Sequence, residues 1–310
     1  MRSILHSIRF CEEQSNTMRI TNSMIQTNAT LSLQSNLQAM STAQNQVSTG
    51  LKYSSFADDP QAQSSVMQTS TALNALNQYQ RNVNDATARA NMEDTVLQQL
   101  TDTVTRATAI ATQQGTATAS ASDRLAAKQE VDNLLSSAVA AGNTQYQGTY
   151  LFGGDNTTTA PVTTTPPFYT GTPPSGTHTT AIGAGQLFKS NHNAKELLLD
   201  TGTLQSLKDL STALGNNDQA GIGAALTSLN NSQQGIQSLV GDLGARENQL
   251  QVTSSNITAL QQNLTTFKSN LSNVDQEQAI TDLVTRQTAY QSAMLATSRV
   301  LGMTLTDYLK

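Results

Sequence analysis

Apolar side chains recur every seven residues along the C-terminal third of the chain. The positions are Ile222, Leu229, Ile236, Leu243, Leu250, Ile257, Leu264 and Leu271. The row three places further on is also largely apolar, although Ser232, Arg246 and Thr253 interrupt it. Spacing of three and four residues places one narrow apolar stripe on an α-helix. The pattern therefore predicts a helix of about fifty residues, about 75 Å long, that packs against other helices.

A second row of the same period lies in the first half of the chain. Its members are Leu76, Val83, Ala90, Leu97, Val104 and Ala111. Glu93 is the polar exception in the companion row. We expect this helix to begin at Pro60, with Asp58 or Asp59 as its cap, and to end near Gly115. From this row, Leu76, Val83, Leu97 and Val104 are predicted to share a bundle core with the first row.

Two shorter helices are predicted between the long ones. The first covers residues 122–141, with Ser122 as its cap and Gly142 as a left-handed stop. The second covers residues 204–214 and is closed by Gly215. Between them, from about residue 148 to 190, the chain is dense in Thr, Gly and Pro and has no helical period. We expect a small β-rich or loop-rich insertion there, with a disordered segment as the alternative.

Weaker apolar stripes lie near both ends of the chain. The expected subunit-assembly residues are Leu33, Leu37, Met40 and Val47 near the N-terminus, and Ile280, Leu283, Met294 and Leu301 near the C-terminus. Neither stripe is rich enough to stabilise an isolated helix, so each needs a partner. That partner is either a neighbouring subunit, which we expect, or the other terminal helix of the same chain.

The fold predicted from these patterns is mostly α, a long antiparallel helical bundle or coiled coil with a small central insertion. The expected parts are an upstream extension or disordered tail (1–17), an N-terminal assembly helix (18–58), the first half of the bundle (59–147), a surface insertion (148–195), the second half of the bundle (196–274) and a C-terminal assembly helix (275–310).

Composition excludes several classes of protein. Charged residues make up 13% of the chain and the net charge is −5, without a cluster of Lys or Arg, so a surface for nucleic acid or an anionic membrane is not expected. The single cysteine, Cys11, cannot form an intramolecular disulfide. The first residues lack the uninterrupted apolar core of a secretory signal, and no apolar run is long enough for a membrane span.

The sequence offers no recognisable catalytic or cofactor site. We expect His6, His178 and His192 to be solvated loop histidines, because none lies at ligand spacing from another candidate. We therefore predict no catalytic, cofactor-binding or metal-binding residues, and no enzyme activity. A membrane-active helix is the other reading of low-charge apolar stripes, but these stripes are flanked by Gln, Asn and Thr rather than Lys or Arg, which favours helix-on-helix packing.

Several segments resemble a known protein family. Residues 46–60 (QVSTGLKYSSFADDP) and 80–86 (QRNVNDA) are similar to the N-terminal signature of bacterial flagellins and hook-associated junction proteins. Residues 244–250 (GARENQL) and 275–290 resemble the C-terminal half of that superfamily. Within it, residues 18–21 (MRIT), 148–154 (GTYLFGG) and 306–309 (TDYL) resemble the hook-filament junction family, hook-associated protein three, more than flagellin itself.

The resemblance implies an exported structural subunit of the flagellum, located at the junction between hook and filament. It also implies type III export without a cleaved signal, assembly through the two terminal helices, and an insertion on the outer surface. The implied partners are hook-associated protein one, flagellin, further copies of the chain in a ring and an export chaperone. Flagellin, the filament subunit, is the alternative identity.

Overall fold

The computed structural model describes residues 22–308. In chain order the elements are α1 (Asn22–Thr49), α2 (Pro60–Gln114), α3 (Ala121–Gly142), β1 (Gln145–Tyr146), β2 (Thr149–Tyr150), β3 (Thr179–Gly183), β4 (Gln186–Lys189), the π-helical turn η1 (Lys195–Leu199), α4 (Thr203–Gly215), α5 (Gln219–Ser272) and α6 (Gln276–Tyr308). The mostly helical fold with a small β-containing insertion is therefore confirmed. The expectation for residues 1–17 lies outside the described residues.

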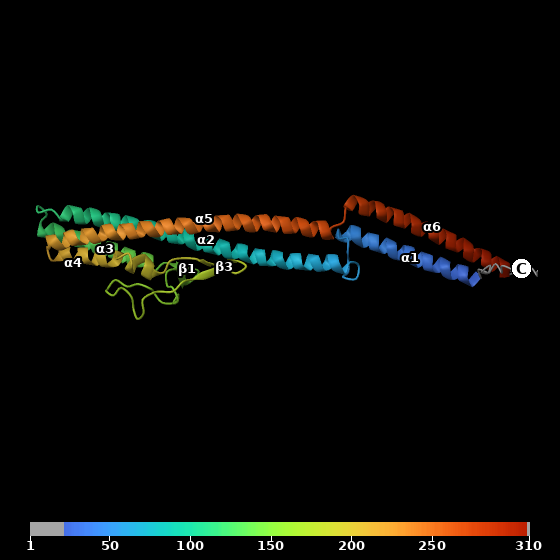
Figure 1. Ribbon diagram of the computed structural model, residues 1–310, viewed down its shortest axis with the longest axis horizontal. Helices are drawn as coiled ribbons and strands as arrows, with labels where there is room; N and C mark the ends of the chain where they lie inside the picture. The colour runs from blue at the N-terminus through green and yellow to red at the C-terminus, as the bar shows by residue number, and fades with distance from the viewer. Residues whose placement is uncertain (1–21, 309–310) are drawn as a thin grey trace, which may run out of the picture. The chain divides into compact units, whose positions relative to one another are not determined.

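The chain forms two compact units. The larger one comprises Thr69–Thr266, and the smaller one is built from the segments before and after it. In the larger unit α2 and α5 run side by side in opposite directions (Figure 1). Hydrogen bonds fix their register, because the Gln80 side chain bonds Ser254 while the Gln219 side chain bonds the carbonyl of Gly115. The predicted antiparallel pair of long helices is confirmed.

Where α3 and α4 join the long helices, the larger unit is a four-helix bundle (Figure 1). Here the companion row is buried at Leu100, Ala107 and Ala225 and partly buried at Leu239, since each long helix meets more than one neighbour. The predicted core residues in this part, all fully buried, are Leu97, Val104, Ile222, Leu229, Ile236 and Leu243. Leu197, Leu204 and Leu207 from the π-helical turn and α4 complete the core.

Away from α3 and α4, the long helices α2 and α5 pack mainly on each other, and the core narrows. Val83, Leu250 and Ile257 are still buried, because Ile182 and Phe188 of the β3–β4 hairpin cover them. The remaining predicted core residues, Leu76, Leu264 and Leu271, are half-buried. The companion row is not buried here, since Leu260 and Phe267 are each 50% exposed. A helix with a single partner has only one narrow face to bury, which is why the second row stays in solvent.

The insertion is ordered and forms part of the core. Its β1–β2 and β3–β4 pairs are antiparallel hairpins. Phe152, Val162 and Phe168 are buried in the main core cluster of the bundle. The insertion predicted at the surface over 148–195 therefore also contributes buried side chains to the core, while others, such as that of Leu187, are exposed.

Two predicted helix ends differ from the structure. Ser120, not Ser122, caps α3, and its hydroxyl and the Asp123 side chain form a reciprocal capping box. Gly142 is the last helical residue rather than a left-handed stop, and Asn143 follows it with a φ of −98°. A Cβ at Gly142 would lie 2.4 Å from a methyl group of Leu198. Glycine is needed there for close packing.

The smaller unit pairs α1 with α6 (Figure 1). The predicted helix over 18–58 ends at Thr49, because Gly50 takes a φ of +72° that turns the chain. Leu51 then forms an antiparallel bridge with Asn273, and the amide of Val274 donates to the carbonyl of Gly50. These bonds join the end of α1 to the start of α6, so the two helices are antiparallel.

Candidate assembly surface and buried polar cluster

One face of α1 lies against α6 within the same chain. Of the expected assembly residues, Leu33, Met40, Val47 and Leu283 are half-buried. The two fully buried side chains described in this unit are alanines, Ala43 and Ala279. Such a thin contact between two helices gives little stabilisation on its own. The helix pair α1–α6 therefore needs further packing partners for its stability.

The outward faces of α1 and α6 carry large apolar side chains. Leu37, Ile280 and Met294, all expected assembly residues, are 46%, 51% and 48% exposed. Further exposed apolar residues on the two helices are Met24, Ile25, Leu31, Val284 and Leu295. The side chain of Leu301 lies outside the described part of the chain. Exposed apolar residues concentrated on one helix pair are typical of a protein–protein contact surface.

The loop between α1 and α2 is held by two adjacent carboxylates. Asp59 Oδ1 accepts from the amides of Gln61 and Ala62, as expected of the cap of α2. Asp58 Oδ2 instead accepts from the amides of Ser54 and Ser55, both at 2.9 Å. These backbone hydrogen bonds, that of Ser55 first, hold the pKa of Asp58 below its ordinary value. Both carboxylates thus stabilise the loop by accepting hydrogen bonds from backbone amides.

In the larger unit a buried polar cluster joins α2, α5 and the segment after β4. His192 is 4% exposed, and its Nδ1 hydrogen-bonds the carboxylate of Glu93, which is fully buried. His192 Nε2 lies 2.6 Å from Nη2 of Arg246. The expectation that His192 is a solvated loop residue was wrong. Its partners, Glu93 and Arg246, are two of the polar residues that interrupt the companion rows of the long helices. The sequence showed these interruptions but did not indicate which residue contacts them.

His178 differs from His192. Its Nδ1 lies 3.2 Å from Ser190 Oγ, and its side chain is exposed beside the β3–β4 hairpin, as expected of a solvated loop histidine. Partial desolvation by neighbouring atoms, followed by the positive charge of Arg89, lowers the pKa of His178. His6 lies outside the described residues.

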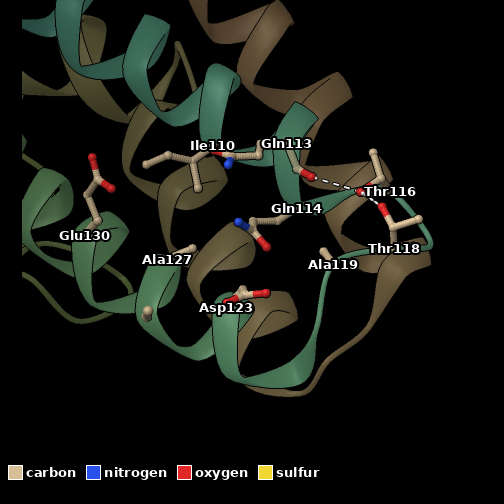
Figure 2. A pocket seen from close by; sticks show the side chains of 10 residues that line it. Ile110, Gln113, Gln114, Thr116, Thr118, Ala119, Asp123, Ala127 and Glu130 are labelled. Atoms are coloured by element: carbon tan, nitrogen blue, oxygen red, sulfur yellow. Dashed lines mark hydrogen bonds between the residues drawn. The ribbon is translucent and has the colours of Figure 1, made fainter.

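A solvent-open cavity of about 500 Å³ lies where α2 turns into α3 (Figure 2). Gln114 extends into it, and its Oε1 is buried without a partner. Two carboxylates line the cavity, but each is already bonded: Asp123 to the Ser120 hydroxyl at 2.7 Å and Glu130 to Arg106 at 2.6 Å. Because each carboxylate is engaged in a structural hydrogen bond, the two do not form a pair of catalytic acid and base.

Residues 22–308 contain no group of three or more His, Cys, Asp or Glu side chains that could hold a metal ion. Over the same residues, no helix is long and apolar enough to cross a membrane.

The long helices match known family models. Residues 20–157 match the bacterial flagellin N-terminal helical region, and residues 220–309 match the bacterial flagellin C-terminal helical region. Together the two matches cover well over half of the chain. The chain belongs to the bacterial flagellin family. It is a structural protein of the flagellum.

Solved structures share the fold of this flagellin-family chain. A flagellar hook-associated protein from Vibrio parahaemolyticus has a TM-score of 0.64 at 21% identity, over 70% of this chain and 100% of that one. FlgL of Bacillus cereus has a TM-score of 0.57 at 24% identity, over 64% and 97% of the two chains. Hook-associated protein 3 of Legionella pneumophila has a TM-score of 0.59 at 14% identity, over 66% and 98%. No curated protein sequence matched.

Between the two matched regions of this flagellin-family member lie residues 158–219. This segment contains β3, β4, η1 and α4. His192 lies in this part, whereas Glu93 and Arg246 lie in the flagellin-like helices. The buried polar cluster thus connects the segment between the two matched regions to both long helices.

Proposed function

We propose that the chain is a structural subunit of the bacterial flagellum that joins the hook to the filament and on which flagellin polymerises. The observation that carries this proposal is that hook-associated and FlgL structures are covered over 97–100% of their length by this chain. Flagellin itself, the filament subunit, is the second candidate, favoured by the two flagellin family models.

Assembly through the smaller unit is supported by its exposed apolar faces. The exposed side chains of Leu37, Ile280 and Met294 lie on a helix pair that buries little within the chain. Neighbouring copies that cover these faces would supply the missing burial, at about 25 cal/mol for each Å² of apolar surface. The interactions are helix packing and amide hydrogen bonds, with no reaction catalysed.

The partners that this role requires are hook-associated protein one on the hook side, flagellin on the filament side and copies of the chain around a ring. A flagellar export chaperone would bind before secretion, and the working location is outside the cell at the hook–filament junction. Neither nucleic acid nor membrane insertion has a part in this role, which agrees with the net charge of −5 and the lack of a basic cluster.

A deletion strain separates the two candidates. Removal of the gene from the source organism should leave hooks in place while flagellin monomers accumulate in the medium, and the intact gene should restore filaments. Complementation with the variant Leu187→Glu, which changes an exposed residue of the insertion, should restore filaments as well. This variant is the control for Leu37→Glu and Ile280→Glu, which place the same charge on α1 and α6. If flagellin monomers disappear from both cells and medium, the chain is the filament subunit and the junction proposal fails.

A further inference from the structure

The cavity between the end of α2 and the start of α3 contains a buried hydrogen-bond acceptor that lacks a donor (Figure 2). Gln114 is only 7% exposed and extends into the cavity, and its Oε1 has no hydrogen-bond partner within residues 22–308. A buried acceptor without a donor is destabilising. A ligand that brings an N–H group into the cavity would remove this cost, so the unpaired Oε1 indicates that the cavity accepts a hydrogen-bond donor.

Two hydroxyl groups of the cavity wall also present acceptors. Thr116 donates its one hydroxyl proton to the carbonyl of Gln113 at 3.1 Å. The hydroxyl oxygens of Thr116 and Thr118 lie 3.3 Å apart, so Thr118 is the donor between them. Both protons are therefore used, and each oxygen keeps a lone pair for a further donor.

Carboxylates give the wall a negative charge. Asp123 accepts from the Ser120 hydroxyl through Oδ2, and Glu130 accepts from Arg106 through Oε1. The second oxygen of each carboxylate takes part in neither bond. Arg106 offsets the charge of Glu130, whereas the neutral Ser120 leaves the charge of Asp123 in place. A donor with a positive charge is therefore the best match, because hydrogen bonds between two charged groups are the strong ones.

The guanidinium of Arg124 lies close in sequence but does not fill this role. It is buried, it is not part of the cavity wall, and it donates to the carbonyls of Gln114 and Thr116 and to the side chain of Asn217. Its positive charge is thus directed at the carbonyl end of α2, where the helix dipole is negative.

The size and the apolar part of the cavity favour an organic cation. A volume of about 500 Å³ is in the range of small-molecule sites. Ile110, Ala126 and Ala127 supply apolar wall that suits methylene groups. Among the described residues that line the cavity, none is aromatic. A quaternary ammonium has no N–H group and is recognised by aromatic rings, so it does not match this site.

We propose that this cavity binds a primary ammonium group on an alkyl chain, supplied by a free polyamine or by a lysine side chain of another protein. The ammonium donates to Gln114 Oε1 and to the second carboxylate oxygen of Asp123, while the charge of Glu130 adds attraction. The alkyl chain contacts Ile110 and the alanines. Oε1 turns toward the ligand by rotation about the last side-chain bond of Gln114, a torsion that is broad in glutamine.

The test is a titration of the full-length protein, followed by the ¹H–¹⁵N signals of the Gln114 side-chain amide at about pH 7.5, where alkyl ammonium groups are protonated. The two probes are 1,4-diaminobutane and Nα-acetyl-lysine N-methylamide. At least one should give a saturable shift with a Kd of about 1 mM or lower, and tetramethylammonium should give none. Tighter binding of the diamine assigns the site to a free polyamine, and tighter binding of the lysine derivative assigns it to a protein side chain.

Three variants make the test specific. Asp123→Asn keeps an acceptor for Ser120 but removes the charge, so it should weaken binding about tenfold. Asp102→Asn removes the same charge from an exposed position of α2 outside the cavity and should leave Kd unchanged within about twofold. Arg106→Ala removes the cation that competes for Glu130 and should tighten binding about twofold to fivefold.

The proposal would be overturned by any of three results. The first is the absence of a saturable shift with both primary amines. The second is equal weakening by Asp123→Asn and Asp102→Asn, which would assign the effect to overall charge. The third is weaker binding in Arg106→Ala, a measurement that remains decisive even if Asp123→Asn does not fold.

Discussion

Arg124 of α3 donates a hydrogen bond to Oδ1 of Asn217, in the turn between α4 and α5, at 2.5 Å. The same guanidinium donates to the carbonyls of Gln114 and Thr116. It is buried, and it satisfies a carbonyl that the end of α2 would otherwise leave unpaired. One side chain thus ties together the two turns at the end of the four-helix bundle.

Replacement of this arginine should be costly. Arg124→Leu leaves the buried carbonyl of Gln114, the carbonyl of Thr116 and the Asn217 side chain without their donor, so we expect a loss of about 3 kcal/mol in the free energy of unfolding. Arg124→Lys should recover only part of it, since an ammonium cannot reach three acceptors in a fixed plane. Urea unfolding followed by circular dichroism measures both. Arg106→Ala, which removes an exposed ion pair with Glu130, is the control and should change stability far less.

Close packing at Gly142 leads to a second prediction. A methyl group there would meet Leu198 at 2.4 Å and Val162 at 2.8 Å, so Gly142→Ala should destabilise the protein by about 1–3 kcal/mol through overpacking. Gly223→Ala is the matched control within α5, where an added Cβ meets nothing within 4 Å. It should stabilise the protein by about 0.5–1 kcal/mol, because alanine is the better helix former. Equal effects of the two changes in urea unfolding would contradict this account of Gly142.

The exposed faces of the smaller unit should matter for assembly and little for folding. Leu37→Glu and Ile280→Glu place charges on exposed positions, so the monomer should keep its helicity and its stability within about 0.5 kcal/mol. Polymerisation, followed by light scattering or electron microscopy, should be lost. Leu187→Glu adds the same charge at a side chain that is 72% exposed in the insertion, and it should assemble normally. Normal polymers of Ile280→Glu would show that this face is not an interface.

Asp58 gives a prediction about pH. Hydrogen bonds from the amides of Ser55 and Ser54 lower the pKa of this carboxyl from its ordinary value of 3.8. The folded loop therefore binds protons less readily than the unfolded chain, so its stabilisation is complete above about pH 3.8 and is lost as the pH falls through the lower, folded pKa. Amide exchange of residues 54 and 55 should accelerate in that acidic range. In Asp58→Asn the acceleration should be absent, and its persistence would assign it to another group.

Periodicity was sufficient for much of the fold. Rows such as Ile222 to Leu271 predict helix, length and buried face together, because only a helix brings every seventh residue onto one side. Asp59 and Pro60 marked the start of α2 for equally local reasons. The insertion was harder, since Phe152 and Phe168 follow no period and their burial depends on the distant helices that they contact.

The polar residues within the apolar rows also separate what local pattern predicts from what depends on tertiary contacts. Glu93 and Arg246 were visible as interruptions of two apolar rows, yet neither residue indicates what balances it. His192 lies far from both in sequence and has no local pattern that predicts burial, so the expectation of a solvated histidine followed naturally and was wrong. Likewise, Leu260 fits the heptad rule but remains exposed, because burial also requires a second helix at that level.

The sequence by itself determined the helices, their lengths, the faces that they can bury and the family to which the chain belongs. These properties depend on neighbours within a few residues, so they can be read from the local sequence without knowledge of tertiary contacts. The tertiary structure alone decided which parts of those faces are covered, and that Glu93, His192 and Arg246 form one buried cluster. A contact between residues 99 positions apart arises only when three separate segments pack together, since no local pattern encodes their meeting.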